Sequence, residues 1–491
     1  MTFATAGVTD TSHGVVPPIP GPADREHFFA AQARNRRAAG RLTALAALGV
    51  ALMGVPMSAV ISPLVYAALL ILIDLVNLVI PGADLLRLLA HADRQPGAGA
   101  LPDALVGVLL VAGLVIPGSL VMLLAWLGVR ALFHRHGTDA LLRSLGAREP
   151  RPDDLEERQL RNLVEEMAIA TGVRPPRVML LDGARANAGA VGSGPDDATL
   201  IVSRRLLDEL DREQSQGIIG QLVGAVGNGD LRAALAIVSM HRAFGLVMAV
   251  LGAPFGPHAR QTLLGLVRLA LRRGRPIEAQ ELEALDEMLA QSADMPESDG
   301  DPSQQTTLAA VLRAPFLIAY TAFWMARLAF VGFVVGPLLA LMWRSRRYLA
   351  DATAVQLTRN PDGVASGLAA LAKRGGVIPG GSWAAPLFVI GPERGPAGGF
   401  RGDDFGIVSF SPPVVSRLAR LRRQGAAVEL PRVRRMHWVA QACIALAVIL
   451  IGAALIGCAL AMAGVALAID MLILMPMVLL THGVLRYGLP G

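Results

Sequence analysis

Lysine is almost missing from this sequence of 491 residues. Lys373 is the only one, and arginine supplies all the other basic side chains. The arginines stand at the flanks of apolar runs and in polar segments, with no basic stripe interleaved with aromatic residues. Nucleic-acid binding depends on such a clustered basic surface, so the sequence argues against it.

Cysteine is nearly as scarce. Cys443 and Cys458 both fall inside an apolar run and form no CxxC pair. The sequence therefore predicts neither a disulfide framework nor a cysteine nucleophile. No GxSxG segment supports a serine mechanism, and no two of the nine histidines stand at HxxxH spacing.

Charged residues are also few, at 17% of the chain against 53% hydrophobic residues, and the mean hydropathy is +0.49. These values are typical of membrane proteins. A bilayer core of about 30 Å needs about 20 apolar residues in a helix. We expect six or seven membrane helices, with a closing hairpin in 438–484. The long apolar runs that would form them are 42–80, 105–133, 231–255, 311–343 and 438–484. Pro56 and Pro63 mark a break that would let 42–80 cross twice, and one or two crossings stay open.

The flanking charges indicate an orientation. The first apolar run follows about forty polar and basic residues, which is too late for a cleavable signal peptide. Residues 31–41 hold four arginines and no acid, so this N-terminal tail should stay in the cytoplasm. Further arginines follow the run 105–133, and we expect the soluble part on the same side.

Two polar stretches, 137–230 and 344–435, hold most of the soluble mass. In 155–171 the apolar residues recur with a helical period, and Gly172 is placed to end that helix. Segments 177–181 and 199–202 read as short strands, and 206–227 reads as one helix. Between the middle runs, 256–310 reads as a polar loop with an interfacial helix.

Several segments resemble the HtpX-like membrane zinc metallopeptidases in order and spacing. They are NLVEEMAIATGVRPPRVMLLD from Asn162, NAGAVG from Asn187, the segment from TLIVS at Thr199 to GNGD at Asp230, RSRRYLADATAVQLTRNPDG from Arg344, and FSPPVVSRLARLRR from Phe410. The resemblance implies an α-helical membrane protein of the bacterial inner membrane, with an α+β metallopeptidase domain interrupted by a transmembrane hairpin. The expected divisions are 1–41, 42–133, 134–230, 231–255, 256–310, 311–343, 344–437 and 438–485.

The metal ligands of that family are missing. An HExxH segment presents two histidines to zinc from one helix face, with the glutamate between them as general base, and a later glutamate completes the set. The resemblance places Gln221 and Ala225 at the histidines, Leu222 at the general base and Arg347 at the third ligand. Ser411 stands where the family has a histidine before two prolines. These side chains predict no zinc and no other cofactor.

Other family positions are retained, namely Asn187, Asn228, Asp230, Tyr348 and Asp351. We expect residues 221, 225 and 347 to converge, and Arg347 to fill the vacated position as a substitute cation paired with Asp351 or Asp230. The alternative is an Arg347 turned into solvent.

The leading hypothesis is a catalytically inactive pseudoprotease that binds or scaffolds membrane or unfolded polypeptides. An extended peptide would add to the sheet beside strand 199–202. One alternative is an active zinc endopeptidase that uses displaced ligands. Another is a transporter, because Asp74, His241 and Asp470 lie within apolar runs, where ionisable residues are functional candidates.

Overall fold

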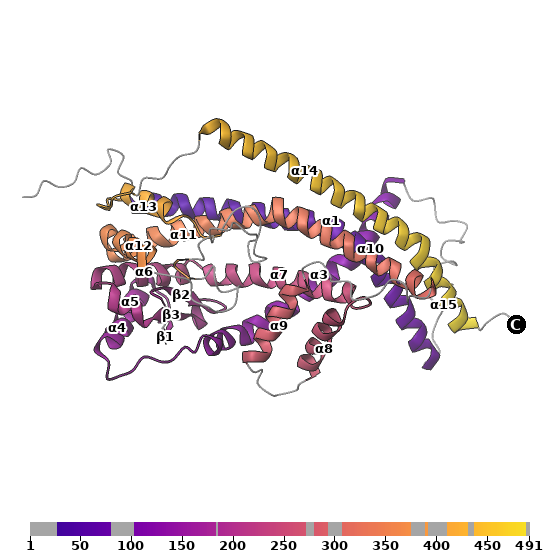
Figure 1. Ribbon diagram of the computed structural model, residues 1–491, viewed down its shortest axis with the longest axis horizontal. Helices are drawn as coiled ribbons and strands as arrows, with labels where there is room; N and C mark the ends of the chain where they lie inside the picture. The colour runs from indigo at the N-terminus through magenta and orange to yellow at the C-terminus, as the bar shows by residue number, and fades with distance from the viewer. Residues whose placement is uncertain are drawn as a thin grey trace, which may run out of the picture.

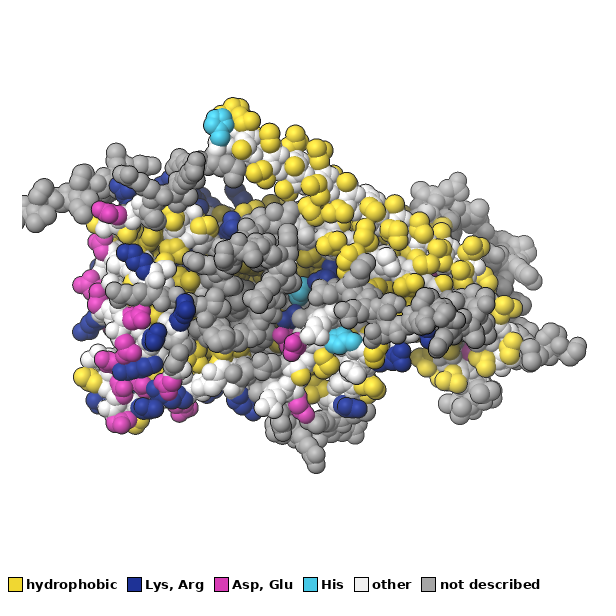
Figure 2. All heavy atoms as spheres, in the orientation of Figure 1, with side chains coloured by type: hydrophobic (Ala, Val, Ile, Leu, Met, Phe, Trp, Pro, Cys, Tyr) yellow, Lys and Arg dark blue, Asp and Glu magenta, His cyan; other side chains and the backbone are white. Residues whose placement is uncertain are grey.

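A computed structural model of the protein describes residues 27–79, 103–182, 185–271, 279–292, 307–374, 388–390, 410–430 and 437–487. The molecule is elongated, with a small sheet and short helices at one end and long helices along the rest of its length (Figure 1). Charged side chains gather at the end that holds the sheet, and hydrophobic side chains cover the long helices (Figure 2). The predicted fold class, a helical membrane protein with a small α+β domain, is confirmed.

Five stretches of the described chain are long and apolar enough to cross a membrane. They are built from α1 (Phe28–Val79), α3 (Asp103–Ser144), α7 (Asp230–Gly252), α10 (Thr307–Phe330) with α11 (Gly336–Thr358), and α14 (Trp438–Ile469) with α15 (Met475–Tyr487). A π-helical turn joins α10 to α11 and another joins α14 to α15. The described residues thus provide fewer spans than the six or seven expected.

The first apolar run forms one helix, α1, with both prolines inside it. Proline is tolerated in membrane helices where neighbouring groups hold the weakened turn in place. Here α3 packs so closely that a side chain at Gly118 would collide with the backbone of Ser58, and the Gly118 N–H donates to Ser62 Oγ at 2.9 Å. The break expected at Pro56 and Pro63 is absent because this contact supports the helix.

The expected C-terminal hairpin is also wrong. The π-helical turn Asp470–Leu474 stands directly before Pro476, and the chain continues from α14 into α15 without reversing (Figure 1). A π turn carries one extra residue, which is a common way to accommodate an irregularity without ending a helix. The stretch 438–485 is therefore one continuous helical stretch, and its most apolar window of 18 residues has a mean hydropathy of 2.8.

The sheet has three strands in the order β1-β3-β2. They are β1 (Arg177–Leu181), β2 (Ala188–Val191) and β3 (Thr199–Ser203), and β3 pairs parallel with β1 and antiparallel with β2. Phe388 adds a bridge to Gly189 on the outer side of β2. The proposed addition of a peptide beside 199–202 is therefore wrong, because both edges of β3 already carry strands.

Short helices lie at the same end of the molecule as this sheet (Figure 1). They are α4 (Leu155–Thr171), α5 (Arg204–Glu209), α6 (Arg212–Gly227), α12 (Pro361–Arg374) and α13 (Val414–Arg423), with a 3₁₀ turn at Pro195–Asp197. Helix α4 has the predicted bounds, and Gly172 ends it in the left-handed conformation at φ 74°. The region 206–227 is two helices rather than one, because Asp211 caps a new helix in a capping box with Gln214. Helices α8 (Pro257–Leu271) and α9 (Ala279–Gln291) lie beside the membrane helices.

An ion cluster ties the chain leaving α3 to the sheet. Arg148 bridges by backbone hydrogen bonds to Leu180 of β1, and its guanidinium binds Glu157 at 2.6 Å and Asp182 at 2.6 Å. Glu157 is fully buried, and the hydrogen bonds from Arg148 hold the pKa of its carboxyl below the usual range. The cluster therefore holds the segment that follows α3 against the sheet, at the junction of the membrane part and the soluble part.

The start of α1 contacts the soluble part. Asn35 Nδ2 donates to the carbonyl of Tyr348 at 3.1 Å, and Gln32 donates to Thr353 Oγ1 at 3.3 Å. Since α3 also ends beside the sheet, the start of α1 and the end of α3 lie on the same side of the membrane part. A single crossing by α1 therefore agrees with placing the N-terminal tail and the soluble part on the same side of the bilayer.

Candidate functional site

The helices that carry the expected ligand positions, α6 and α11, pack directly against each other. A side-chain carbon at Gly224 would lie 2.9 Å from Thr353, and one at Gly220 would lie 3.8 Å from the backbone of Ala354. Glycine at Gly224 lets the backbones approach, in the manner of small residues at helix interfaces. The predicted convergence of 214–227 with 344–357 is confirmed for the helices, although these segments are more than a hundred residues apart.

Helix α6 presents no ligand of the HExxH type. Gln221 and Leu222 are completely buried and Ala225 is 5% exposed. Leu222 belongs to the main hydrophobic core. The amide oxygen and nitrogen of Gln221 have no hydrogen-bond partner among the described residues. Such a buried, unpaired amide costs about 1–3 kcal/mol, so its polar atoms are available to a small ligand or water at this place.

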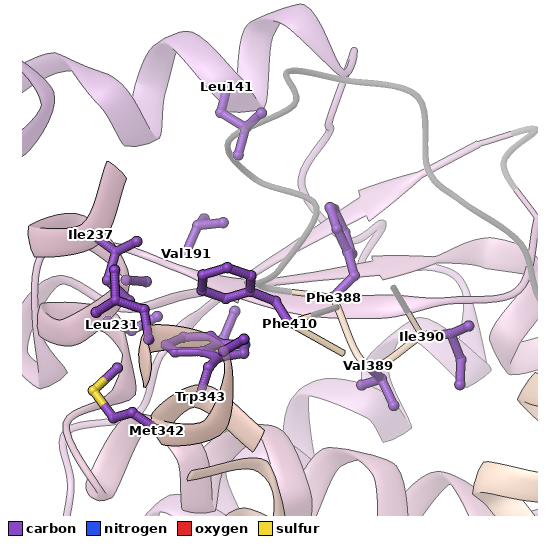
Figure 3. Close-up of a cluster of buried hydrophobic side chains, with 14 of the residues drawn as sticks. Leu141, Val191, Leu231, Ile237, Met342, Trp343, Phe388, Val389, Ile390 and Phe410 are labelled. Atoms are coloured by element: carbon purple, nitrogen blue, oxygen red, sulfur yellow. The ribbon is translucent and has the colours of Figure 1, made fainter. Parts of the chain in front are cut away.

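Arg347 points into the protein. It is 4% exposed, its guanidinium donates to the carbonyl of Phe388 at 2.9 Å, and it lies 5.4 Å from the ring centre of Trp343. Trp343 itself meets Phe410 in a buried apolar cluster between β2, α7 and α11 (Figure 3). The alternative in which Arg347 turns into solvent is wrong.

The ion pairs around Arg347 use other arginines than the sequence suggested. Arg417 holds Asp351 with two hydrogen bonds, of 2.6 and 2.9 Å, and Arg346 holds Asp230 at 3.0 Å. Arg347 lies within electrostatic range of both carboxylates without hydrogen-bonding to either. The expected pair of Arg347 with Asp351 or Asp230 is therefore wrong.

Helix geometry explains the exchange of partners. Neighbouring residues on a helix point about 100° apart, so Arg346 faces the start of α7 while Arg347 faces the segment at Phe388. Arg417 comes from α13, and its third hydrogen bond goes to the carbonyl of Val389 at 3.0 Å. Arg346 and Arg417 thus pair with Asp230 and Asp351, and Arg347 adds a third buried guanidinium close to both carboxylates.

Asn187 has a structural task. It is fully buried immediately before β2, its Nδ2 donates to the carbonyl of Ile390 at 2.9 Å, and its Oδ1 accepts from the N–H of Ala188 at 2.9 Å. Together with the Gly189–Phe388 bridge, these bonds hold segment 388–390 against the sheet. Asn187 thereby positions the carbonyl of Phe388, which accepts the hydrogen bond from Arg347.

The other retained positions join α6, α11 and α13. Asn228 Nδ2 donates to Thr353 Oγ1 at 3.2 Å, which links the end of α6 to α11. The ring of Tyr348 lies 3.7 Å beneath the guanidinium of Arg420, a cation–π contact. Ser411 is half-buried just before α13, next to the buried Phe410. These contacts hold the scaffold together around the ligand positions.

Sequence reasoning missed Arg417 and Trp343. Arg417 belongs to the quoted segment FSPPVVSRLARLRR and shares the buried face of α13 with Leu418 and Leu421. A charged residue on the apolar face of a short helix needs a buried partner, so the position of Arg417 could have predicted a buried ion pair. Nothing local in the sequence indicated Trp343, which was counted as the end of a membrane run.

Two of the ionisable residues in the membrane helices contact each other. Asp74 of α1 bonds to Nδ1 of His482 in α15, at 2.7 Å. Asp470 is completely buried, and its carboxylate has no hydrogen-bond partner in the described part of the chain. Among the described residues, no direct contact joins Asp74 to Asp470 or to His241, whereas a polar pathway joining the three would favour the transporter hypothesis.

Comparison with known proteins identifies relatives over the same region. The model of the family described as Peptidase family M48 matches residues 154–424, more than half of the chain. The "Protease HtpX homolog" of Dictyoglomus thermophilum is 26% identical over 309 residues, 63% of this chain and 82% of the relative. The "Protease HtpX homolog" of Thermoanaerobacter pseudethanolicus is 24% identical over 319 residues, 63% of this chain and 84% of the relative. No solved structure matches.

Proposed function

Because the chain belongs to peptidase family M48 and is HtpX-like, we propose that it is a membrane-embedded pseudoprotease, which binds or scaffolds other polypeptides without cleaving them. The observation that carries the proposal is the chemistry at the ligand positions. A buried guanidinium, Arg347, stands at the sequence position of the third ligand, and Gln221, Ala225 and Leu222 give α6 an amide, a methyl group and an isobutyl group at the other three positions.

These residues do not fit zinc. Structural and catalytic zinc sites use thiolate, imidazole or carboxylate ligands, three or four in number. Among the four positions only Gln221 offers a neutral oxygen, and the positive charge of Arg347 repels a cation. In the described part of the chain, no group of three or more histidine, cysteine, aspartate or glutamate side chains is placed to hold a metal. The pseudoprotease keeps the helices of the family while its catalytic groups are replaced.

We expect the purified chain to hold far less than one zinc per molecule and to leave casein intact. Elemental analysis of detergent-purified protein measures the metal, and casein digestion with and without chelator measures the activity. A relative with an intact HExxH segment, purified in the same way, serves as the positive control. Zinc near one per chain together with chelator-sensitive cleavage would establish the alternative, an endopeptidase with displaced ligands.

We further propose that the soluble part faces the cytoplasm of a bacterial cell and that the chain lies in the inner membrane. Support comes from the four arginines of 31–41 and from the arginines at 130, 135, 143 and 148, since basic residues near membrane helices favour the cytoplasmic side. The start of α1 beside Tyr348 puts both groups of arginines on one side.

This topology predicts the behaviour of reporter fusions. A fusion at residue 150 should be active as a cytoplasmic reporter, such as a fluorescent protein, and inactive as alkaline phosphatase. A fusion in segment 80–102, between α1 and α3, is the internal control and should give the opposite pattern. Phosphatase activity at residue 150 with none at 80–102 would place the soluble part in the periplasm and refute the assignment.

A further inference from the structure

The membrane part contains a cavity that the proposed function does not use. It has a volume of about 720 Å³ and lies between α1, α3, α7 and α11. Its lining is almost wholly apolar and includes Ala51, Val55, Leu123, Met240 and Leu339. The volume falls in the range of about 300–1,000 Å³ in which proteins hold one small ligand.

The shape of the cavity follows the membrane helices. Along α1 it extends from Thr43 to Ser58, which at 1.5 Å per residue is about 22 Å, most of the thickness of one bilayer core. Val55 is 48% and Leu123 49% exposed, so the lining is continuous with the outer surface of the helices. In a bilayer that surface faces hydrocarbon, and an apolar chain can enter from the side.

An aromatic ring and a cation lie at the end of the cavity nearest the soluble part. Trp126 forms part of the wall, and its indole N–H donates to the carbonyl of Ala236 at 3.4 Å. Arg130, one turn further towards the soluble part, stacks on the Trp126 ring with its guanidinium 5.3 Å from the ring centre. No carboxylate contacts Arg130 among the described residues, so it remains free to bind an anion. Tryptophan and arginine together are typical of the membrane–water interface.

We propose that this cavity binds an anionic phospholipid, with one acyl chain between the helices and the phosphate at Arg130. The apolar length suits an acyl chain, and the guanidinium of Arg130 beside Trp126, at the end nearest the soluble part, suits a charged headgroup. The opening towards the bilayer supplies a route of entry. The proposal does not depend on whether the metal position is active, because none of the residues at that position lines the cavity.

Two substitutions test the cavity. Ala51→Trp places a large ring in the space, and Ala453→Trp puts the same ring on the exposed face of α14, away from the cavity. The protein is purified in detergent, washed, and analysed by mass spectrometry for phospholipid per chain. We expect about one phospholipid for the wild type and for Ala453→Trp, and at least a fivefold loss for Ala51→Trp. Ala47→Phe, also in the lining, replaces Ala51→Trp if that variant does not fold.

The headgroup is tested by reconstitution into equal amounts of phosphatidylglycerol and phosphatidylcholine. The wild type should retain the anionic lipid about fivefold over the neutral one, and Arg130→Gln should retain both equally. Equal retention by the wild type would overturn the assignment to an anionic lipid. Undiminished lipid in Ala51→Trp and Ala47→Phe, or a stoichiometric polypeptide in place of lipid, would overturn the cavity assignment itself.

Discussion

Replacing Arg417 by alanine is expected to lower the free energy of unfolding by about 3–5 kcal/mol, the usual cost of removing one partner of a buried ion pair. Arg417 is 1% exposed and holds Asp351, 3% exposed, through two hydrogen bonds. Its removal would leave the Asp351 carboxylate buried with no strong partner and free the carbonyl of Val389 as well. The thermal midpoint of the detergent-purified chain, followed by tryptophan fluorescence, measures the effect.

Arg422→Ala is the matched control. Arg422 lies on the same helix, α13, but is exposed, so its removal should change the unfolding free energy by less than about 0.5 kcal/mol. The double variant Asp351→Leu with Arg417→Met should recover most of the loss, because apolar groups of similar volume can replace a buried pair. An Arg417→Ala midpoint equal to that of Arg422→Ala would show that water reaches Asp351 and that the pair is not buried in solution.

Local signals in the sequence predicted the short elements of the soluble part well. Helix α4 follows from its apolar period and from Gly172, and both bounds agree with the structure. Strands β1 and β3 follow from short runs of branched apolar residues. The one local error, a single helix over 206–227, came from ignoring Asp211, an N-cap residue three positions before Gln214.

Long-range pairing was predictable only where the resemblance supplied it. The contact of α6 with α11 came from the order of the family's motifs. The partner of Asp351 did not, because Arg417 is 66 residues away and Arg347 is nearer in sequence. The edge of β2 is covered by residues 388–390, which belong to the short apolar run LFVI, a local signal that was overlooked in a stretch rich in glycine and proline. Sequence spacing cannot tell which of several arginines reaches a carboxylate.

The membrane helices show a different limit. Apolar runs fix where the chain crosses, but not whether a long run turns back. In α1 the prolines suggested a turn, and the packing of Gly118 on Ser58 instead keeps the helix continuous. In 438–485 the π-helical turn before Pro476 has the same result. Length and proline content alone therefore overestimated the number of crossings.

Four simultaneous substitutions, Gln221→His, Leu222→Glu, Ala225→His and Arg347→Glu, are expected to create a zinc-dependent protein. The first three restore HExxH on α6, and the fourth restores the carboxylate on α11, which packs against it. Zinc bound to the folded state at about 1,000 times its Kd would stabilise the variant by about 4 kcal/mol, while the wild type should not respond to zinc.

Charge balance gives the physical reason. In the wild type, Arg346 and Arg417 pair with Asp230 and Asp351, and Arg347 lies close to both carboxylates. The two glutamates introduced at 222 and 347 and the loss of Arg347 make the charge of this region more negative by three units. A divalent cation offsets two of these units, and buried carboxylates without a counter-ion are strongly disfavoured. The variant without zinc should therefore be less stable than the wild type.

The triple variant that keeps Arg347 is the decisive control. It has both histidines and the general base, but it keeps the buried guanidinium of Arg347 at the position that the resemblance assigns to the third ligand, where the positive charge would repel the metal. Thermal midpoints with zinc, with chelator and with magnesium should separate the quadruple variant from the triple one, and zinc alone should raise the former. If the triple variant binds zinc equally well, Arg347 does not occupy the metal position. If the quadruple variant folds but does not bind zinc, α6 and α11 no longer hold the ligand geometry of the family. The chain would then differ from the family in the arrangement of these helices as well as in the four side chains.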